Sequence, residues 1–247
     1  MTMQMKQLNG APTKAMVLAA GLGTRMRPIT ATIPKPLVEV AGKSLIDHGL
    51  DRLAAAGIET AVVNVHYLAD LLERHVTQRQ NPGIVISDER DALLDTGGGI
   101  RKALPVFNGE PFLLLNSDSF WIEGVRPNLS ILAESWNSET MDILLMVAAT
   151  VSSVGYSGRG DFTLSTDGRL TRRPERTVAP FVYAGAAVLH PRIFEKVGDG
   201  SFSLNRMFDE AIERERLFGV RMEGMWFHVG TPAAIEVTDL AVLESAA

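Results

Sequence analysis

The sequence predicts an α/β fold: a Rossmann-like, doubly wound mixed sheet within one domain. Two observations carry this prediction. Apolar strand-like segments alternate with amphipathic helix-like segments over the first 150 residues, and short glycine-punctuated segments follow. With 247 residues and 46% hydrophobic composition, the chain can bury a large core. We therefore expect one domain at 14–247 after an N-terminal extension at 1–13, with halves at 14–150 and 151–247.

In the first half, short apolar runs predict strands and 3.6-residue periodicity predicts helices. The segment 44–56, for example, spaces Leu45, Ile46, Leu50 and Leu53 along one side and closes at Gly57. Asn81-Pro82 separates a helix from the strand that follows it. Strands are expected at 14–18, 60–65, 83–87, 111–115 and 141–149, and helices at 44–56, 67–79 and 100–104, the last stopped at residue 105.

In the second half, glycines punctuate short segments, which is typical of hairpins. Asp167-Gly168 favours a tight turn between strands at 161–165 and 169–172. Further along, we expect a strand at 182–189, an amphipathic helix at 204–215, an edge strand at 219–222 and a final helix at 232–243.

The segment 17–36 holds the most chemistry in the chain. A buried strand ends in Ala19-Ala20, and Gly21 and Gly23 then leave room for anion oxygens to approach main-chain N–H groups. Arg25 adds a planar fork of donors suited to phosphate, whereas Arg27 fits a phosphate contact and a solvent-facing side chain equally well. Lys35 stands between Pro34 and Pro36, which bias the backbone toward an extended course and limit its freedom. Together these features predict a polyphosphate site.

Two other glycine-loop motifs do not fit. A dinucleotide fingerprint needs a third small residue where Met26 stands and an acidic residue after the next strand, where Asn64-Val65-His66 occurs. A P-loop needs glycine five positions before Gly42-Lys43-Ser44, but residue 37 is leucine. We interpret Lys43 as a surface lysine.

Composition limits the partners. The net charge is −5, so no global basic field attracts nucleic acid, and the positive charge that matters must be local. The chain lacks cysteine, which excludes thiolate catalysis and thiolate metal sites. The first thirteen residues carry no apolar signal-peptide core, and no later segment stays apolar for about 20 residues. These features predict a soluble cytoplasmic protein that binds a small anion, with no membrane partner.

Asp118 is the leading metal ligand. It follows the apolar strand 112–115, so its carboxylate emerges at the carboxyl end of a central strand, where open α/β sheets place their ligands. A carboxylate there suits Mg²⁺ bound to phosphates, and a turn-capping aspartate is the alternative. Attack on a phosphate also concentrates charge that Arg25 and Lys35 can neutralise, which makes these two the catalytic candidates.

The motifs Gly-Leu-Gly-Thr-Arg-Met-Arg-Pro-Ile-Thr at 21–30 and Pro-Lys-Pro at 34–36 resemble the signature of the sugar-1-phosphate nucleotidyltransferases. The segments 94–99, 116–118 and 226–231 occur in the order and approximate spacing of that family, so the resemblance spans residues 14–240. It implies a GT-A-like fold and an enzyme that joins a nucleoside triphosphate to a sugar-1-phosphate, releasing pyrophosphate. The resemblance assigns nucleotide binding to Ala20, Gly21, Gly23, Thr24, Arg25, Lys35, Asp95, Gly97 and Gly98.

The metal site departs from the family pattern. Many members carry aspartate where this chain has His228, and that aspartate is their second metal ligand. Histidine is a softer nitrogen donor that suits Mn²⁺ or Zn²⁺ better than Mg²⁺. Three outcomes stay open: a metal held by Asp118 and His228, a metal held by Asp118 and phosphates alone, or a weakened enzyme.

The sugar side is expected in the second half of the chain. The resemblance points to Asn116, Arg159, Gly160, Asp161 and the segment 183–185, ending at Gly185. Arg159 is equally consistent with an exposed hairpin cation. The glycine triplet at 97–99 is expected to be a loop that reads the nucleobase, and its form favours UTP over GTP or dTTP.

Within the family, the short chain, the motif Gly-Gly-Gly-Ile-x-Lys-Ala-Leu-Pro and the segment 158–162 resemble the uridylyltransferases that act on N-acetylmuramate-1-phosphate in peptidoglycan recycling. The alternatives are a guanylyltransferase for mannose- or heptose-1-phosphate and a non-catalytic nucleotide-sugar sensor. The expected cofactor is Mg²⁺ or Mn²⁺, and the expected state is a monomer or small homo-oligomer.

Overall fold

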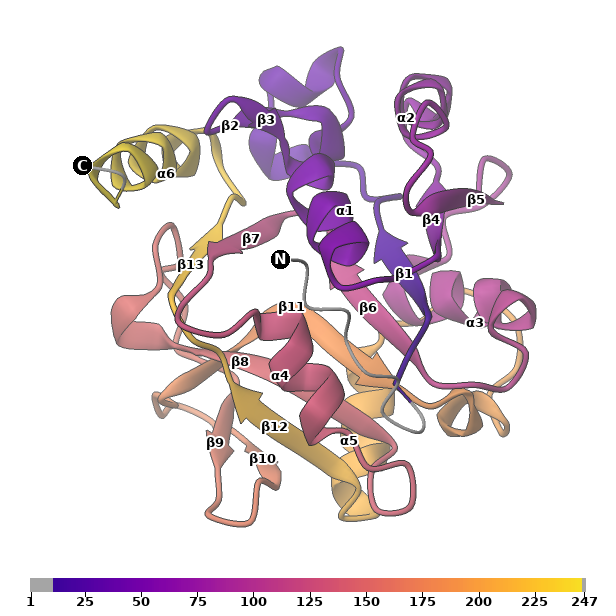
Figure 1. Ribbon diagram of the computed structural model, residues 1–247, viewed down its shortest axis with the longest axis vertical. Coiled ribbons are helices and arrows are strands. Elements are labelled where there is room, and N and C mark those ends of the chain that lie inside the picture. The colour runs from indigo at the N-terminus through magenta and orange to yellow at the C-terminus, as the bar shows by residue number, and fades with distance from the viewer. Residues whose placement is uncertain (1–10, 246–247) are drawn as a thin grey trace.

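The computed structural model describes residues 11–245, and a nine-stranded mixed sheet forms its core (Figure 1). The central strands run parallel in the order β6-β1-β4-β5, as the alternation of strands and helices predicts. Their bounds are β1 (Lys14–Leu18), β4 (Thr60–Val65), β5 (Gly83–Asp88) and β6 (Phe112–Asn116).

Most of the remaining strand pairs in the sheet are antiparallel. Strand β11 (Phe181–Leu189) pairs with β6 on one side and with β8 (Ile143–Ala149) along most of its length. At the sheet's far end lie β12 (Leu217–Arg221), which is parallel to β8, and the hairpin of β9 (Phe162–Leu164) and β10 (Leu170–Arg172). Because the sheet continues across residue 150, the two halves of the sequence share one core and form a single domain.

Helices cover both faces of the sheet (Figure 1). Side chains of α1, α2 and α4 pack into one apolar cluster, and those of α3 and α5 pack into a second cluster on the opposite face. This arrangement confirms the doubly wound class. Their bounds are α1 (Leu45–Ala55), α2 (Ala69–Val76), α3 (Asp95–Phe107), α4 (Asn128–Ser135) and α5 (Asn205–Glu213).

A third, smaller cluster anchors the segments beside the glycine loop. Met26 and Phe227 are completely buried in it, together with apolar residues of β2 (Glu39–Val40) and β7 (Ser119–Ile122). Strand β2 pairs with β3 (Lys43–Ser44), β7 pairs with β13 (Met225–His228), and α6 (Pro232–Ser245) packs against the same cluster. The C-terminal motif 226–231 is therefore held next to residues 24–40.

Several expected boundaries were wrong. Helix α2 is shorter than 67–79, and Ser44 is the N-cap of α1 rather than part of it. Helix α3 begins at Asp95 instead of residue 100 and continues through Pro105. Strands β7 and β13 and helix α4 were not predicted. The first ten residues of the expected N-terminal extension lie outside the described residues.

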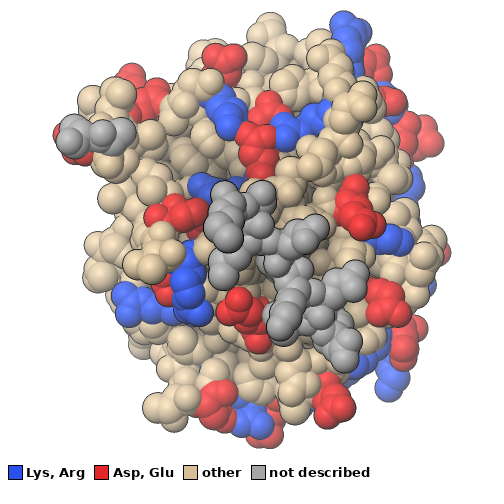
Figure 2. Space-filling model, in the orientation of Figure 1, with Lys and Arg blue, Asp and Glu red and all other residues tan. Residues whose placement is uncertain are grey.

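Charged side chains of both signs interleave on the face shown in Figure 2. Among residues 11–245, no helix is long and apolar enough to cross a bilayer.

Candidate active site

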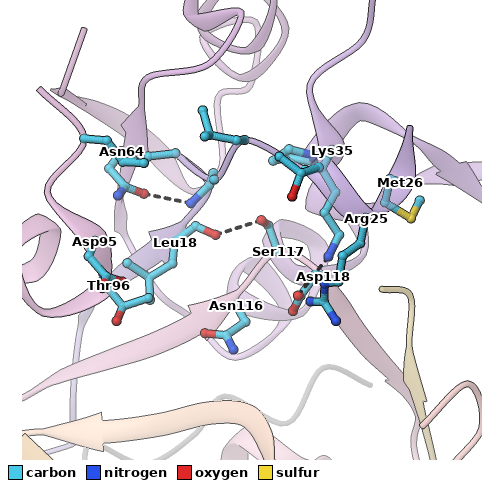
Figure 3. Close-up of a pocket in the computed structure, with 18 of the residues that line it drawn as sticks. Leu18, Arg25, Met26, Lys35, Asn64, Asp95, Thr96, Asn116, Ser117 and Asp118 are labelled. Carbon is cyan, nitrogen blue, oxygen red and sulfur yellow. Dashed lines mark hydrogen bonds and ion pairs between the residues drawn. The ribbon is translucent and has the colours of Figure 1, made fainter. Parts of the chain in front are cut away.

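A cavity of about 590 Å³ opens at the carboxyl ends of β1 and β6 (Figure 3). This is the edge of a parallel sheet at which α/β folds bind their ligands. The glycine loop, the start of α3 and the end of β6 contribute its walls. The lining residues are Leu18 to Met26, Lys35, Pro36, Asn64, Leu93, Asp95, Thr96, Asn116, Ser117, Asp118, Ser201 and Gly230.

The glycine loop is held in shape by contacts on its inner side. Gly23 has a φ of 62°, a conformation that L-residues rarely adopt, and a Cβ there would come 3.1 Å from side-chain carbons of Lys35 and Thr30. The buried Thr30 hydroxyl donates to the Gly23 carbonyl at 2.8 Å. Met26 is completely buried in the third apolar cluster. The backbone of residues 19–25 therefore lies along the cavity wall as the sequence predicts.

Lys35 and Asp118 form an ion pair in the lining of the cavity. Their ammonium and carboxylate groups are 2.9 Å apart, with 14% and 27% of the side chains exposed. Burial raises the pKa of Asp118, but Lys35, His228 and Arg25 together outweigh it and hold that pKa below its usual range. The carboxylate is therefore ionised at neutral pH. It can attract a second cation in addition to the Lys35 ammonium.

The backbone around Lys35 differs from the expectation. Pro34 is extended, with a ψ of 143°, but Lys35 begins a short 3-10 turn that ends at Leu37. Burial of Pro36 fixes that turn against the protein. Arg25 is exposed at the cavity wall, so its guanidinium is available to a ligand. Arg27 is exposed and is not among the lining residues.

His228 lies beside Asp118 without lining the cavity. The Val229 amide, next in the chain, donates to the Asp118 carbonyl at 2.9 Å, and the His228 ring stacks on Trp226 with centroids 5.8 Å apart. Burial and the charges of Lys35 and Arg25 lower the pKa of His228, against an opposing effect of Asp118. The imidazole is therefore neutral at pH 7, the form that binds metals.

These two residues fit a divalent cation only in part. An ionised Asp118 is a suitable hard ligand, and a neutral imidazole is an acceptable second one. Within residues 11–245, however, no group of three or more His, Asp or Glu side chains could hold a metal. A cation at Asp118 would therefore need most of its ligands from substrate oxygens and water.

The glycine triplet is buried in the first turn of α3, which corrects the expectation of a loop. A Cβ on Gly97 would overlap Phe202, and a Cβ on Gly98 would overlap the Gly200 carbonyl. Neither residue lines the cavity. The glycines therefore allow α3 to pack against 200–202, and the adjacent Asp95 and Thr96 face the cavity instead.

The candidates for the sugar side are split. Asn116 lines the cavity, and its side chain forms no hydrogen bond to any residue in 11–245. Arg159, Gly160, Asp161 and Gly185 do not line it. Gly160 has a φ of 74° and lies against the Ala179 carbonyl, and Asp161 accepts a bond from the Tyr183 amide at 3.0 Å. A Cβ on Gly185 would overlap Ser119, so local packing already requires glycine there.

Sequence reasoning missed three lining residues of interest. Asn64 is 2% exposed and accepts a bond from the Ala19 amide at 2.7 Å. Ser117 donates to the Leu18 carbonyl at 2.7 Å, which locks β6 to β1 at the cavity edge. Ser201 reaches the cavity from a segment far along the chain. Asn64 stands near the end of a predicted strand, which is the signal that could have placed it in the cavity. Nothing local in the sequence identifies Ser201.

The arrangement suits the neutralisation of several linked anionic groups. Two cations, Arg25 and Lys35, and the backbone of residues 20–25 line the same cavity as the carboxylates of Asp118 and Asp95. Such a site can bind a polyphosphate and stabilise charge that develops during phosphoryl or nucleotidyl transfer. Among the described residues that line this cavity, no serine or threonine hydroxyl is hydrogen-bonded to a histidine or a carboxylate that could act as its general base.

Comparison with known proteins agrees with this geometry. Residues 14–244 match the family model described as nucleotidyl transferase. The chain is 49% identical, over 92% of its length and 96% of the relative, to an N-acetylmuramate alpha-1-phosphate uridylyltransferase of Caulobacter vibrioides. It is 34% identical to one from Neisseria meningitidis, over 88% of this chain and 93% of that one. An apo UDP-glucose pyrophosphorylase structure shares the fold, with a TM-score of 0.76 at 19% identity over 96% of this chain and all of the other. The chain therefore belongs to the nucleotidyl transferase family, and within it to the sugar-1-phosphate nucleotidyltransferases.

Proposed function

We propose that this enzyme transfers UMP from UTP to N-acetylmuramate alpha-1-phosphate and releases pyrophosphate. The observation that carries the choice of substrates is the 49% identity to a relative of that name, which extends over 96% of the relative's length. The cavity supports the chemistry, since its cations and its carboxylate converge where a triphosphate and a second phosphate would meet.

The chain's residues act by position and charge. The triphosphate lies along the backbone of 20–24, with Arg25 and Lys35 on its phosphates. An oxygen of the sugar-1-phosphate attacks the α-phosphorus, the bond from that phosphorus to the bridging oxygen breaks, and pyrophosphate leaves with the electron pair. The attacking phosphate is already ionised, so no general base is needed. Lys35 and Arg25 stabilise the charge that grows on the α-phosphate and on pyrophosphate.

Asp118 and His228 are the residues that would hold the divalent cation. When bound, Mg²⁺ or Mn²⁺ supplies further positive charge to the phosphates. Lys35 already neutralises Asp118 in part, so the carboxylate stays ionised in the free protein and needs no proton release before it binds the cation.

The two substrates are proposed to occupy different walls. Asp95, together with the main chain at the start of α3 next to Gly97 and Gly98, reads the uracil edge. Asn116 contacts the sugar ring because its amide is free among the described residues and faces the cavity. Arg159, Gly160, Asp161 and Gly185 are proposed to approach the sugar beyond the cavity rim, where the exposed Arg159 would pair with a lactyl carboxylate.

One other activity has support. A mannose-1-phosphate guanylyltransferase subunit of Danio rerio is 29% identical over 89% of this chain, but this chain covers only 61% of that protein. Guanylyl transfer is therefore the second candidate. A sensor without catalytic activity is the third, because histidine replaces the usual metal-binding aspartate.

A substrate panel separates these possibilities. Pyrophosphate release is measured with UTP, GTP, dTTP and CTP, each crossed with N-acetylmuramate-, N-acetylglucosamine-, mannose- and glucose-1-phosphate. We expect the highest kcat/KM for UTP with N-acetylmuramate-1-phosphate. A preference for GTP with mannose-1-phosphate would overturn the proposal in favour of the second candidate. Binding of UTP without any pyrophosphate release would favour the sensor.

The cellular setting follows from the proposed substrates. We place the reaction in the cytoplasm because it consumes UTP, and we expect a monomer or small homo-oligomer.

A further inference from the structure

A buried carboxylate lies directly behind the cavity and takes no part in the proposed chemistry. Glu89 follows β5, is completely buried, and forms no ion pair among residues 11–245. Its backbone is fixed to the end of β4, since its amide donates to the Val65 carbonyl at 2.8 Å and its carbonyl contacts His66 Nδ1 at 2.7 Å. A buried charge without a cation is costly unless several donors serve it.

The donors that serve Glu89 come from strand β4 and from the residue before α3. Its Oε1 accepts from Asn64 Nδ2 at 2.8 Å, and its Oε2 accepts from the Leu94 amide at 3.1 Å. Asn64 Oδ1 in turn accepts from the Ala19 amide at 2.7 Å, the bond dashed at Asn64 in Figure 3. One continuous chain of hydrogen bonds therefore joins Ala19, which precedes the glycine loop, to Leu94, which precedes α3.

With asparagine at position 64, the polarity of this chain admits only a carboxylate at position 89. Both ends are backbone N–H donors, so the two side chains between them must present an acceptor at each end and one donor in the middle. Asparagine at 64 provides the donor, and Glu89 must then accept twice. Gly99 leaves the necessary space, because a Cβ there would come 2.6 Å from Glu89 Oε1 and 2.9 Å from Asn64 Nδ2.

We propose that Asn64 and Glu89 are positioning residues that fix the spacing between the glycine loop and the start of α3, and so tune the site for the nucleoside triphosphate. Three observations support this: both ends of the hydrogen-bond chain adjoin cavity-lining residues, Asn64 itself lines the cavity, and each polar atom of the pair is satisfied by one partner. The proposal rests on the proposed function only in naming the ligand as the nucleotide.

The polarity argument makes a reciprocal exchange the decisive test. Glu89→Gln turns an N–H group toward a donor, and Asn64→Asp brings two carboxylates together, so each single variant breaks the chain. In the double variant Asn64→Asp/Glu89→Gln, the new carboxylate at position 64 accepts from the Ala19 amide and from the new side-chain amide at position 89. The side-chain oxygen at position 89 then accepts from the Leu94 amide. The double variant keeps one buried negative charge and all three hydrogen bonds.

The variants are compared with the wild type by urea unfolding and by KM for each substrate, using the triphosphate and sugar phosphate that the wild type prefers. We expect each single variant to lower the urea midpoint and to raise KM for the triphosphate at least about fivefold, more than for the sugar phosphate, as loss of a buried hydrogen bond implies. The double variant should reverse more than half of the fall in the urea midpoint and more than half of the rise in KM for the triphosphate. Gly99→Ala, which crowds the pair without changing its polarity, should raise KM for the triphosphate in the same direction.

The outcomes separate this inference from the proposed function. If the double variant is as impaired as the two single variants combined, the hydrogen-bond chain does not operate as described. If the single variants lower the urea midpoint without raising KM for the triphosphate, and the double variant restores the midpoint, the pair only stabilises the fold and the positioning role is wrong. If the wild type prefers another sugar phosphate or nucleotide, only the choice of substrates in the proposed function fails.

Discussion

Lys35 is the residue whose role the site defines most sharply. Its side chain is 14% exposed, and the proposed mechanism requires its charge on the reacting phosphates. We expect Lys35→Ala to lower kcat about 100-fold or more, the usual cost of removing one preorganised group that stabilises a transition state. Arg25→Ala should have a comparable effect. Stability should change by less than about 1 kcal/mol, since the ion pair with Asp118 is partly exposed.

Lys43 provides the matched control for Lys35. It lies eight residues further along the chain, is 45% exposed on its side chain and forms an ion pair with Asp51. Lys43→Ala should retain the wild-type turnover. A near-wild-type rate in Lys35→Ala, measured by pyrophosphate release, would remove the basis of the phosphate site.

The unusual histidine makes metal binding a second prediction at this scale. We expect Mn²⁺ titration to show a dissociation constant at least about tenfold higher in Asp118→Asn and in His228→Ala. Even the loss of a residue that only hydrogen-bonds to a metal ligand weakens metal binding by that much. Removal of divalent metal with a chelator should abolish turnover in the wild type, and Mg²⁺ or Mn²⁺ should restore it. If His228→Ala keeps both the metal affinity and the turnover, Asp118 and the phosphates hold the metal without it.

At the scale of elements, two of the helical glycines, Gly98 and Gly49, give opposite predictions. Gly98 in α3 lies against the Gly200 carbonyl, so Gly98→Ala should destabilise the protein by about 1–3 kcal/mol through overpacking. Gly49 in α1 has only an ordinary contact, 3.5 Å from Leu115, so Gly49→Ala should stabilise by up to about 1 kcal/mol. Urea unfolding with unchanged m-values measures both. A neutral Gly98→Ala would mean that α3 can move away from 200–202.

The sequence predicts the strands of the nine-stranded sheet better than the helix ends. Strand β4 was predicted at its observed bounds because an apolar run is buried on both faces of a parallel sheet. Helix α3 was not, since its three glycines and Pro105 argue locally for a loop and a stop. Packing against 200–202 overrides that preference, and no local pattern records a contact with residues a hundred positions away.

The candidate site shows the same division. Asp118 could be placed at the cavity from the sequence because it follows the end of a predicted strand. Arg25 and Lys35 could be singled out because glycines precede the one and prolines flank the other. Glu89 and Ser201 could not be found, because their placement depends on how strand β5 and the 200–202 segment pack around α3.

At the scale of the whole molecule, Asp142 joins three parts of the antiparallel region. Its carboxylate is 3% exposed and accepts bonds from Arg192 at 2.5 Å and Arg216 at 2.8 Å. It stands directly before β8, Arg216 directly before β12, and Arg192 in the turn after β11. Burial raises the pKa of Asp142, but the two arginines outweigh it and lower that pKa.

Asp142 should therefore make stability depend on acid. Because the pKa of Asp142 is lowered in the folded state, the ionised carboxylate adds to the free energy of unfolding at pH values above its unfolded-state pKa of about 4. This stabilisation is lost as the pH falls through the folded-state pKa. We expect Asp142→Asn to destabilise by about 2–3 kcal/mol at pH 7, below the range for fully buried pairs because both arginines are partly exposed. Unfolding curves of the wild type and the variant should converge below about pH 4. A difference that stays constant down to about pH 3 would contradict this.

The central claim is that the cavity beside the glycine loop binds the reacting nucleotide, and a crystal structure of the protein with UTP tests it most directly. We predict the triphosphate within about 3 Å of backbone amides of residues 20–25, with Lys35 and Arg25 on its oxygens and the uracil at the start of α3. An empty cavity, with UTP bound elsewhere on the protein, would contradict the account.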